Sequence, residues 1–295
     1  MDIKTRRAGL WWDGITTKGD VLWLSAWIGG LLVVWLWDAF FLNTPAFERI
    51  QAAFINSLLT GLMVVLMALV LGWLLGVALH MLERSDSKSL YGLASFATDL
   101  LRSVPQIILV LIGYVILTVL LHEGVVRSTA AQLVWIAFTI AVAVMLEVAD
   151  TVREQIDYFR TLDFVDAMLC CGIRERRIIN VEILWKNSRS HLLHKLIAIF
   201  GASIFLQCSI DFIVSVGLST DVSLINFPVT LGSLLANVDS KQDILALSNI
   251  VADPGYISLI FTRHLQGISV AFCIIFTLLC MYMIANGFVK RRRLI

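Results

Sequence analysis

The chain has 295 residues, of which 59% are hydrophobic and only 15% are charged, and its formal net charge is +1. An average soluble domain is about 45–50% apolar and about 25% charged, so this composition excludes an ordinary soluble enzyme. The near-zero net charge gives no reason to expect a nucleic-acid partner. We therefore expect an all-α integral membrane protein.

Apolar runs of about 20 residues are long enough to cross a bilayer as helices. Six such runs predict a polytopic bundle of six transmembrane helices. In chain order they cover residues 21–42, 53–82, 98–121, 131–149, 192–218 and 267–289. The first run is long and rich in tryptophan and lacks a small-residue cleavage site, so we interpret it as a retained span rather than a signal peptide.

Lysine and arginine are retained on the cytoplasmic side of membrane proteins. With six spans, both termini share one side with the loops at 83–97 and 150–191. Counting Lys195 at the start of the fifth run, that side holds 18 lysines and arginines against 4 on the other. Both termini are therefore predicted to be cytoplasmic. We divide the chain into residues 1–52, an N-terminus with the first span, and residues 53–295, a core of five spans that carries the 150–191 loop.

Ionisable side chains within a span cost about 2.5–3.5 kcal/mol on insertion scales, so each needs a partner or a wet cavity. We interpret Asp38 and Glu147 as interfacial residues, because they lie near the ends of their runs. Arg102 and Pro105 lie near the start of the third run, where a snorkelling cation and a proline kink are sufficient explanations.

The second run contains Gly72 and Gly76, whose GxxxG spacing is typical of close helix packing in membranes. The sequence has no GxxxxGK[ST] loop, so we expect this chain to bind no ATP of its own. It also has no HExxH motif, nucleophile elbow or metal-ligand spacing, and we predict neither catalysis nor a metal site.

A polar, arginine-bearing segment at 161–185 separates the fourth and fifth runs. The apolar residues that recur at helical spacing in its first half are Phe164, Ala167, Met168 and Cys171. Gly172 follows at the position of a helix C-cap, and Arg174 opens a second helical pattern. These features predict two short helices joined at a glycine. From periodicity alone, an amphipathic loop lying on lipid headgroups is the alternative.

In the fifth run, Asp211 is the candidate for the translocation pathway, with Gln207 one turn earlier on the same helix face. A structural hydrogen bond between helices is the alternative for this aspartate. The segment at 219–266 is too long for a turn and too polar to span. Its apolar clusters predict short helices that cap the pore, with Pro228 and Gly232 as candidates for an outer gate or docking surface, and a plain loop is the alternative.

The 161–185 segment resembles the EAA loop of bacterial ABC importer membrane subunits, whose pattern is Glu-Ala-Ala, three residues, Gly, nine residues, then Ile-x-Leu-Pro. The residues at these pattern positions are Asp166, Ala167, Met168, Gly172, Glu182, Leu184 and Trp185. The stretches DLLRSVPQIILVLIG and SVGLSTDVSLINFPVTLGSLLANVDSKQDIL resemble the corresponding regions of peptide and nickel importer permeases. Phosphonate-type permeases stay open as relatives, because their third span is similar.

This resemblance implies a type I ABC importer-like bundle in the bacterial inner membrane that forms half of a pore for a small solute, such as a di- or oligopeptide. It implies an ATPase-coupling role for Phe164, Asp166, Ala167, Met168, Gly172, Glu182 and Leu184. The implied partners are ATPase subunits that bind ATP and Mg, a second permease subunit, an extracytoplasmic solute-binding protein and membrane lipid. A self-sufficient channel, secondary carrier or membrane enzyme is the alternative class.

Overall fold

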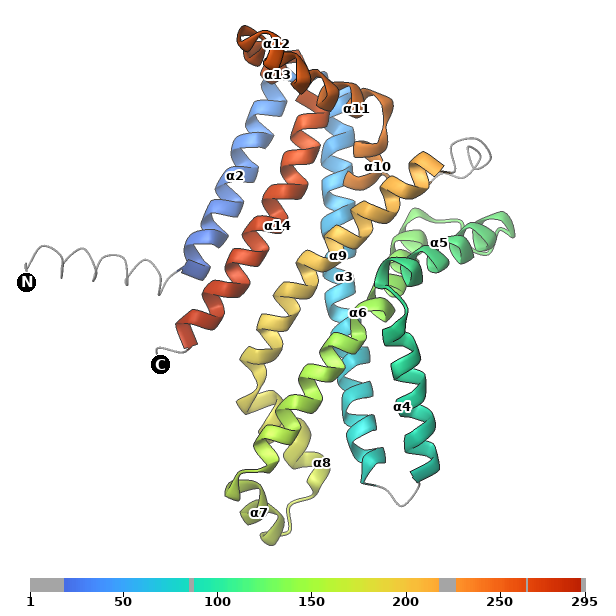
Figure 1. The fold of residues 1–295 in the computed structure, drawn as a ribbon, viewed down its shortest axis with the longest axis vertical. Coiled ribbons are helices and arrows are strands. Elements are labelled where there is room, and N and C mark those ends of the chain that lie inside the picture. The colour runs from blue at the N-terminus through green and yellow to red at the C-terminus, as the bar shows by residue number, and fades with distance from the viewer. Residues whose placement is uncertain (1–18, 85–87, 218–226, 264, 293–295) are drawn as a thin grey trace, which may run out of the picture.

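The computed structural model describes residues 19–84, 88–217, 227–263 and 265–292, and every element in these ranges is a helix (Figure 1). The helices of sixteen residues or more are α2 (Gly19–Phe41), α3 (Thr44–Glu83), α4 (Lys88–Ser103), α5 (Gln106–His122), α6 (Thr129–Arg160), α9 (Arg189–Gly217) and α14 (Leu265–Arg292). The shorter ones are α7 (Asp163–Cys170), α8 (Glu175–Arg177), the π-helix η1 (Ile178–Asn187), α10 (Leu231–Ala236), α11 (Val238–Leu245), η2 (Ala246–Ser248), α12 (Asn249–Ala252), η3 (Pro254–Tyr256) and α13 (Ile257–Arg263).

Five of the described helices, α2, α3, α6, α9 and α14, are long and apolar enough to cross a membrane. The all-α prediction is confirmed for the described residues, and these helices fit a transmembrane protein by their length and composition. The predicted third span at 98–121 is not one straight helix, because α4 and α5 meet there at a bend of 93°. The count reaches six only if this bent pair is taken as one span. The residues between the first two predicted spans, 43–52, are helical from Thr44 onward, because α3 begins there.

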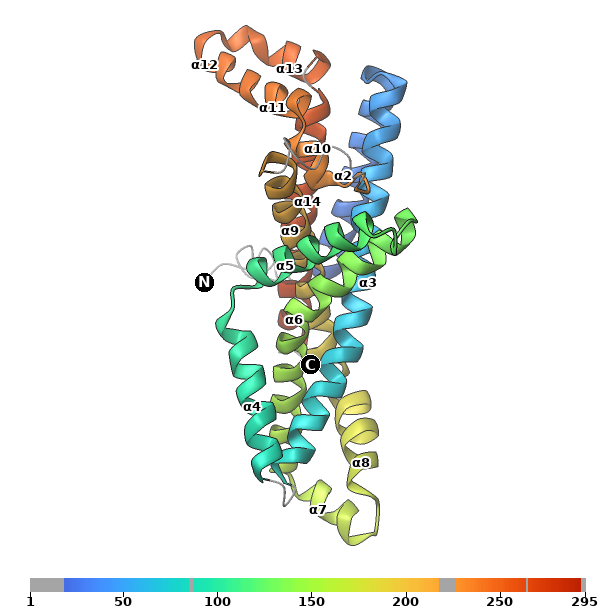
Figure 2. The ribbon, with the colours of Figure 1, turned by 90° about the vertical axis from the view of Figure 1, so that its right-hand side faces the viewer.

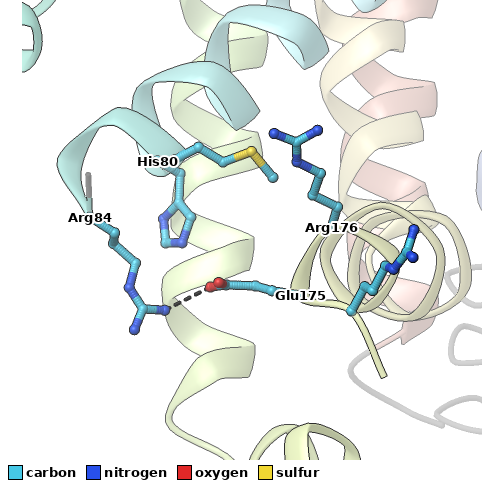
Figure 3. A pocket seen from close by; sticks show the side chains of 6 residues that line it. His80, Arg84, Glu175 and Arg176 are labelled. Atoms are coloured by element: carbon cyan, nitrogen blue, oxygen red, sulfur yellow. Dashed lines mark hydrogen bonds and ion pairs between the residues drawn. The ribbon is translucent and has the colours of Figure 1, made fainter. Parts of the chain in front are cut away.

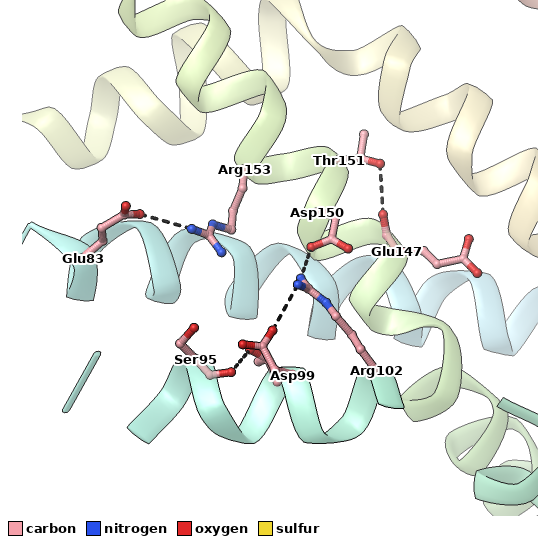
Figure 4. Close-up of polar contacts among 9 residues, drawn as sticks. Glu83, Ser95, Asp99, Arg102, Glu147, Asp150, Thr151 and Arg153 are labelled. Carbon is pink, nitrogen blue, oxygen red and sulfur yellow. Dashed lines mark hydrogen bonds and ion pairs between the residues drawn. The ribbon is translucent and has the colours of Figure 1, made fainter. Parts of the chain in front are cut away.

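The corner between α4 and α5 has both local and long-range causes. Pro105 lacks an amide hydrogen, and a proline disfavours helical geometry in the residue before it. On the α4 side, the Arg102 guanidinium pairs with Asp150 of α6 (Figure 4). On the α5 side, Gln106 Nε2 donates to Glu147 Oε1 at 2.8 Å. Two carboxylates one turn apart on α6 therefore hold both arms of the corner, and Arg102 is ion-paired rather than snorkelling.

The main core is formed where α3 crosses α6, with α5, α9 and η1 packed around them. The two glycines of the GxxxG pattern lie at this crossing. A Cβ atom at Gly72 would lie 2.5 Å from Val148 Cβ, and one at Gly76 would lie 2.8 Å from Val152 Cγ1. No real Cβ tolerates such distances, so only glycine permits the helices to approach this closely. The predicted packing role of this pair is confirmed.

Helix α2 packs mainly on α14 rather than on its chain neighbour α3. Trp27 Nε1 donates to Thr277 Oγ1 at 3.1 Å, and Ser269 Oγ donates to Asp38 Oδ1 at 2.6 Å. Asp38, expected at the interface, is instead only 2% exposed and has the interior partner that a buried carboxylate needs.

Two regions lie at opposite ends of the bundle, as the two views show (Figures 1 and 2). The α7–η1 protrusion, residues 163–187, lies at the end where α3 and α6 finish. The α10–α13 lobe, residues 227–263, lies beyond the other ends of α9 and α14. Its short helices confirm the prediction for that part of the segment, whereas positions 219–226 lie outside the described residues.

Candidate functional site: the α7–η1 protrusion and the Asp211 cluster

The first helix of the protrusion ends in a Schellman motif. Gly172 N donates to Leu169 O at 2.9 Å and Ile173 N donates to Met168 O at 3.2 Å, the two bonds that define this cap. Gly172 has φ +75°, a backbone conformation that glycine adopts without steric cost. The sequence prediction of a helix that ends at this glycine is confirmed.

The buried face of α7 differs from the predicted one by about one residue. Val165 is buried, and Phe164 and Met168 are half-buried against the main core. Ala167 and Cys171, expected on the same apolar face, are exposed together with Asp166 and Leu169. The chain thus packs one side of α7 on itself and presents the other side outward. The rings of Phe159 and Phe164 pack edge to face, with their centroids 6.2 Å apart, and this contact links α7 to the end of α6.

The ten-residue π-helix η1 follows from the spacing of its apolar residues. Ile178 and Ile183 are five apart, as are Ile179 and Leu184, and all four are at most 2% exposed. An i to i+5 ladder places such pairs on one face, and Ser188 N continues it by donating to Ile183 O at 2.8 Å. Leu184, predicted to contact an ATPase, is therefore buried within this chain.

Of the remaining η1 residues, one is hydrogen-bonded to the bundle and others lie at the surface. Trp73 Nε1 of α3 donates to Asn180 Oδ1 at 2.8 Å, which anchors η1 to the bundle. Glu182 lies at the edge of the segment and pairs with Lys186, one turn later, at 2.8 Å. Trp185, at the proline position of the loop pattern, is 70% exposed. Of the predicted coupling residues in η1, only Glu182 reaches the surface.

Glu175 connects the protrusion to the ends of two long helices. Its Oε1 accepts from Arg84 Nη1 at 2.7 Å, at the end of α3 (Figure 3). The same oxygen lies 3.2 Å from Arg160 Nη1, at the end of α6. The Arg160 guanidinium also donates to His80 Nε2 at 2.8 Å. A displacement of α8 would therefore act on both helices through one carboxylate.

The Asp211 cluster lies inside the bundle, where α5, α9 and the start of α10 meet. Tyr114 of α5 donates to Asp211 Oδ1 at 2.6 Å, and Thr230 Oγ1 donates to Oδ2 at 2.5 Å. Asp211 is 7% exposed, so both carboxylate oxygens are satisfied by hydroxyl groups of this chain in a buried setting. This geometry favours the structural hydrogen-bond interpretation of Asp211. Gln207 is fully buried, and neither of its side-chain polar atoms has a partner among the described residues.

The two residues proposed for an outer gate lie against this cluster. A Cβ at Gly232 would lie 2.6 Å from Cys208 Cα and 2.9 Å from Asp211 Cβ, so α10 packs directly on α9. Pro228 is buried two residues before Thr230. The structure thus brings Asp211 and Gly232 together across 21 positions of the chain.

Sequence reasoning missed the partners of Asp211 and the link from the lobe to α3. Thr230 had a local signal, because it forms a capping box with Ser233 before an apolar helix. Tyr114 had none, since a tyrosine in an apolar run gives no indication of its partner. Asn56 Nδ2 donates to Val229 O at 2.8 Å and Leu231 N donates to Ser57 Oγ at 3.0 Å, which join the lobe to α3.

Both sites are built from polar contacts that join several helices, the α7–η1 protrusion at one end of the bundle and the Asp211 cluster inside it. No protein-family model matches this chain, and no curated protein matches it.

Proposed function

We propose that this chain is the membrane subunit of an ABC importer and forms half of the translocation pore, while a separate subunit hydrolyses ATP. The observation that carries the proposal is the α7–η1 protrusion. Its two helical segments join at a left-handed glycine, at the spacing of the EAA loop, and lie at one extremity of a helical membrane protein.

The two faces of α7 support a coupling role. Asp166, Ala167 and Leu169 are exposed and free to enter a cleft of an ATPase subunit. The opposite face packs on the core, and Glu175 binds the ends of α3 and α6. Motion of α7 would therefore be passed to the long helices, as expected of a segment that converts ATPase closure into opposite pore states.

The α10–α13 lobe, at the end of the bundle opposite the protrusion, is the proposed docking surface for a solute-binding protein. In the proposed importer, which lies in the bacterial inner membrane with both termini cytoplasmic, this lobe receives an extracytoplasmic binding protein loaded with a small peptide or related solute. The second permease subunit, a copy or a paralogue, pairs with this chain through apolar helix faces. One such face is on α5, where Ile108, Ile112 and Val115 are 46–58% exposed.

Affinity purification of the tagged full chain tests the proposal. The chain is expressed with its chromosomal neighbours, extracted in mild detergent, and its retained partners are identified by mass spectrometry. We expect a P-loop ATPase to co-purify with the native chain and to be lost from Leu169→Glu, which places a charge on the exposed face of α7.

The matched control is Leu245→Glu, an equally drastic change on the exposed surface of α11 at the opposite end. It should retain the ATPase. If the native chain purifies as a monomer or homo-oligomer without any ATPase, the importer proposal fails, and a self-sufficient channel or carrier becomes the better description.

A further inference from the structure

A hollow of about 520 Å³ lies between the end of α3 and helix α8 of the protrusion. It is lined by His80, Met81, Arg84, Arg174, Glu175 and Arg176 (Figure 3). Three of its six lining residues are arginines, contributed by two elements that are 90 positions apart in the chain. Such convergence differs from a row of arginines spread along one solvated face.

The charges around the hollow do not cancel. Glu175 is already bound by Arg84 and Arg160, so one carboxylate faces two guanidinium groups. Arg174 and Arg176 have no ion pair among the described residues. Asp157, whose side chain is 63% exposed, lies 3.5 Å from His80 Nδ1. Among the six lining residues, three guanidinium groups face the single carboxylate of Glu175, so the lining carries an excess of positive charge.

His80 lies in the wall of the hollow. Arginine has no acceptor, so the contact from Arg160 Nη1 requires His80 Nε2 to accept the hydrogen bond. The other ring nitrogen, Nδ1, lies 3.5 Å from the Asp157 carboxylate. His80 thus holds the Arg160 guanidinium and the Asp157 carboxylate of α6 at this wall.

We propose that this hollow binds a phosphate-bearing anion, with the guanidinium groups of Arg84 and Arg176 as its main donors. Planar guanidinium forks match phosphate oxygens and form the stronger, charge-assisted class of hydrogen bond. The headgroup of an anionic phospholipid and free phosphate share this chemistry, and the experiment below distinguishes them. The site does not depend on the importer assignment, since it needs only these side chains.

The experiment uses the purified full chain in detergent. Native mass spectrometry compares retention of phosphatidylglycerol with that of phosphatidylcholine, and a parallel thermal unfolding series adds inorganic phosphate alone. We expect a preference for phosphatidylglycerol of about tenfold, which falls to about onefold in the double variant Arg84→Gln/Arg176→Gln. Arg189→Gln, an exposed arginine elsewhere in the same polar region, should keep the native preference.

A second variant separates loss of the site from loss of the fold. Glu175→Gln removes the carboxylate that competes for Arg84, so it should strengthen retention of phosphatidylglycerol by about threefold, an outcome that damage to the fold does not produce. If phosphate alone stabilises the native chain and not the double variant, the ligand is the free anion. Equal retention of both lipids with no phosphate effect, or an equal loss in Arg189→Gln, would overturn the proposal.

Discussion

The two ends of the bundle are held in different ways. The α10–α13 lobe is joined to α3, α5 and α9 through buried hydrogen bonds centred on Asp211, Thr230 and Ser57, and through a glycine pressed against backbone atoms. The α7–η1 protrusion has its own buried apolar residues, such as Ile178 and Ile183, but its charged contacts with the ends of α3 and α6 are ion pairs whose side chains are partly exposed, such as Arg84 with Glu175.

The difference in burial decides how stiff each end is. A buried polar group that loses its partner costs about 1–3 kcal/mol, whereas an exposed ion pair contributes about 0–1 kcal/mol. The polar contacts of the lobe are therefore costly to break, while the ion pairs that join the protrusion to the ends of α3 and α6 can rearrange at little cost. An element that transmits motion from a partner needs this lower resistance, which agrees with the proposed coupling role.

The largest effect should come from removing the centre of the buried cluster. Asp211→Ala leaves the Tyr114 and Thr230 hydroxyls without their acceptor, and we expect a loss of about 3 kcal/mol of stability. Thermal unfolding in detergent measures it, with Asp166→Ala on the exposed face of α7 as the control. Equal melting temperatures for the two variants would show that the cluster contributes no more than a surface residue.

A smaller effect is expected from filling the contact between α9 and α10. In Gly232→Ala the new methyl group would meet Cys208 backbone atoms at 2.6–2.7 Å, which cannot rotate away, so we expect a loss of about 2 kcal/mol. Resistance of the lobe to limited proteolysis reports this change directly. Gly92→Ala is the control, because nothing lies within 4 Å of the Cβ position at Gly92.

The glycine of the protrusion should be more tolerant of the same substitution. Gly172→Ala meets no neighbouring atom, and its cost of about 1 kcal/mol comes only from the left-handed backbone. Hydrogen exchange should become faster in residues 163–177 and stay unchanged in the lobe. A fall in melting temperature as large as that of Gly232→Ala would contradict the contrast between the two ends.

The smallest effect on stability should come from the ion pairs of Glu175 with Arg84 and Arg160. Glu175→Gln removes two ion pairs with partly exposed partners, so the expected loss is about 0.5 kcal/mol. In the proposed importer this variant should uncouple ATP hydrolysis from transport more than it lowers the melting temperature. Glu48→Gln, an exposed glutamate near the lobe end, controls for the change of charge, and equal coupling in both variants would remove Glu175 from the transmission path.

Local signals in the sequence predicted local features well. The turn at Gly172 and the packing of Gly72 and Gly76 follow from a few residues at short spacing, and each of these was correctly predicted. The existence of short helices in the lobe also followed from local apolar clusters.

Features that depend on distant partners were not predictable. Pro105 indicates a kink, but the 93° corner depends on Asp150 and Glu147, which lie more than 40 positions away. The five-residue spacing of Ile178, Ile179, Ile183 and Leu184 was visible in the chain, yet a π-helix is so rare that an α-helix was the reasonable expectation.

Helix α3 is one unbroken element of 40 residues, about 60 Å long, which is twice the thickness of the hydrocarbon core. Its only proline is Pro45, in the first turn. Asn56 and Ser57 touch the lobe, and Arg84 touches Glu175 of the protrusion. The lobe and the protrusion are thus connected by a single unbroken helix, so a tilt imposed at one end must appear at the other.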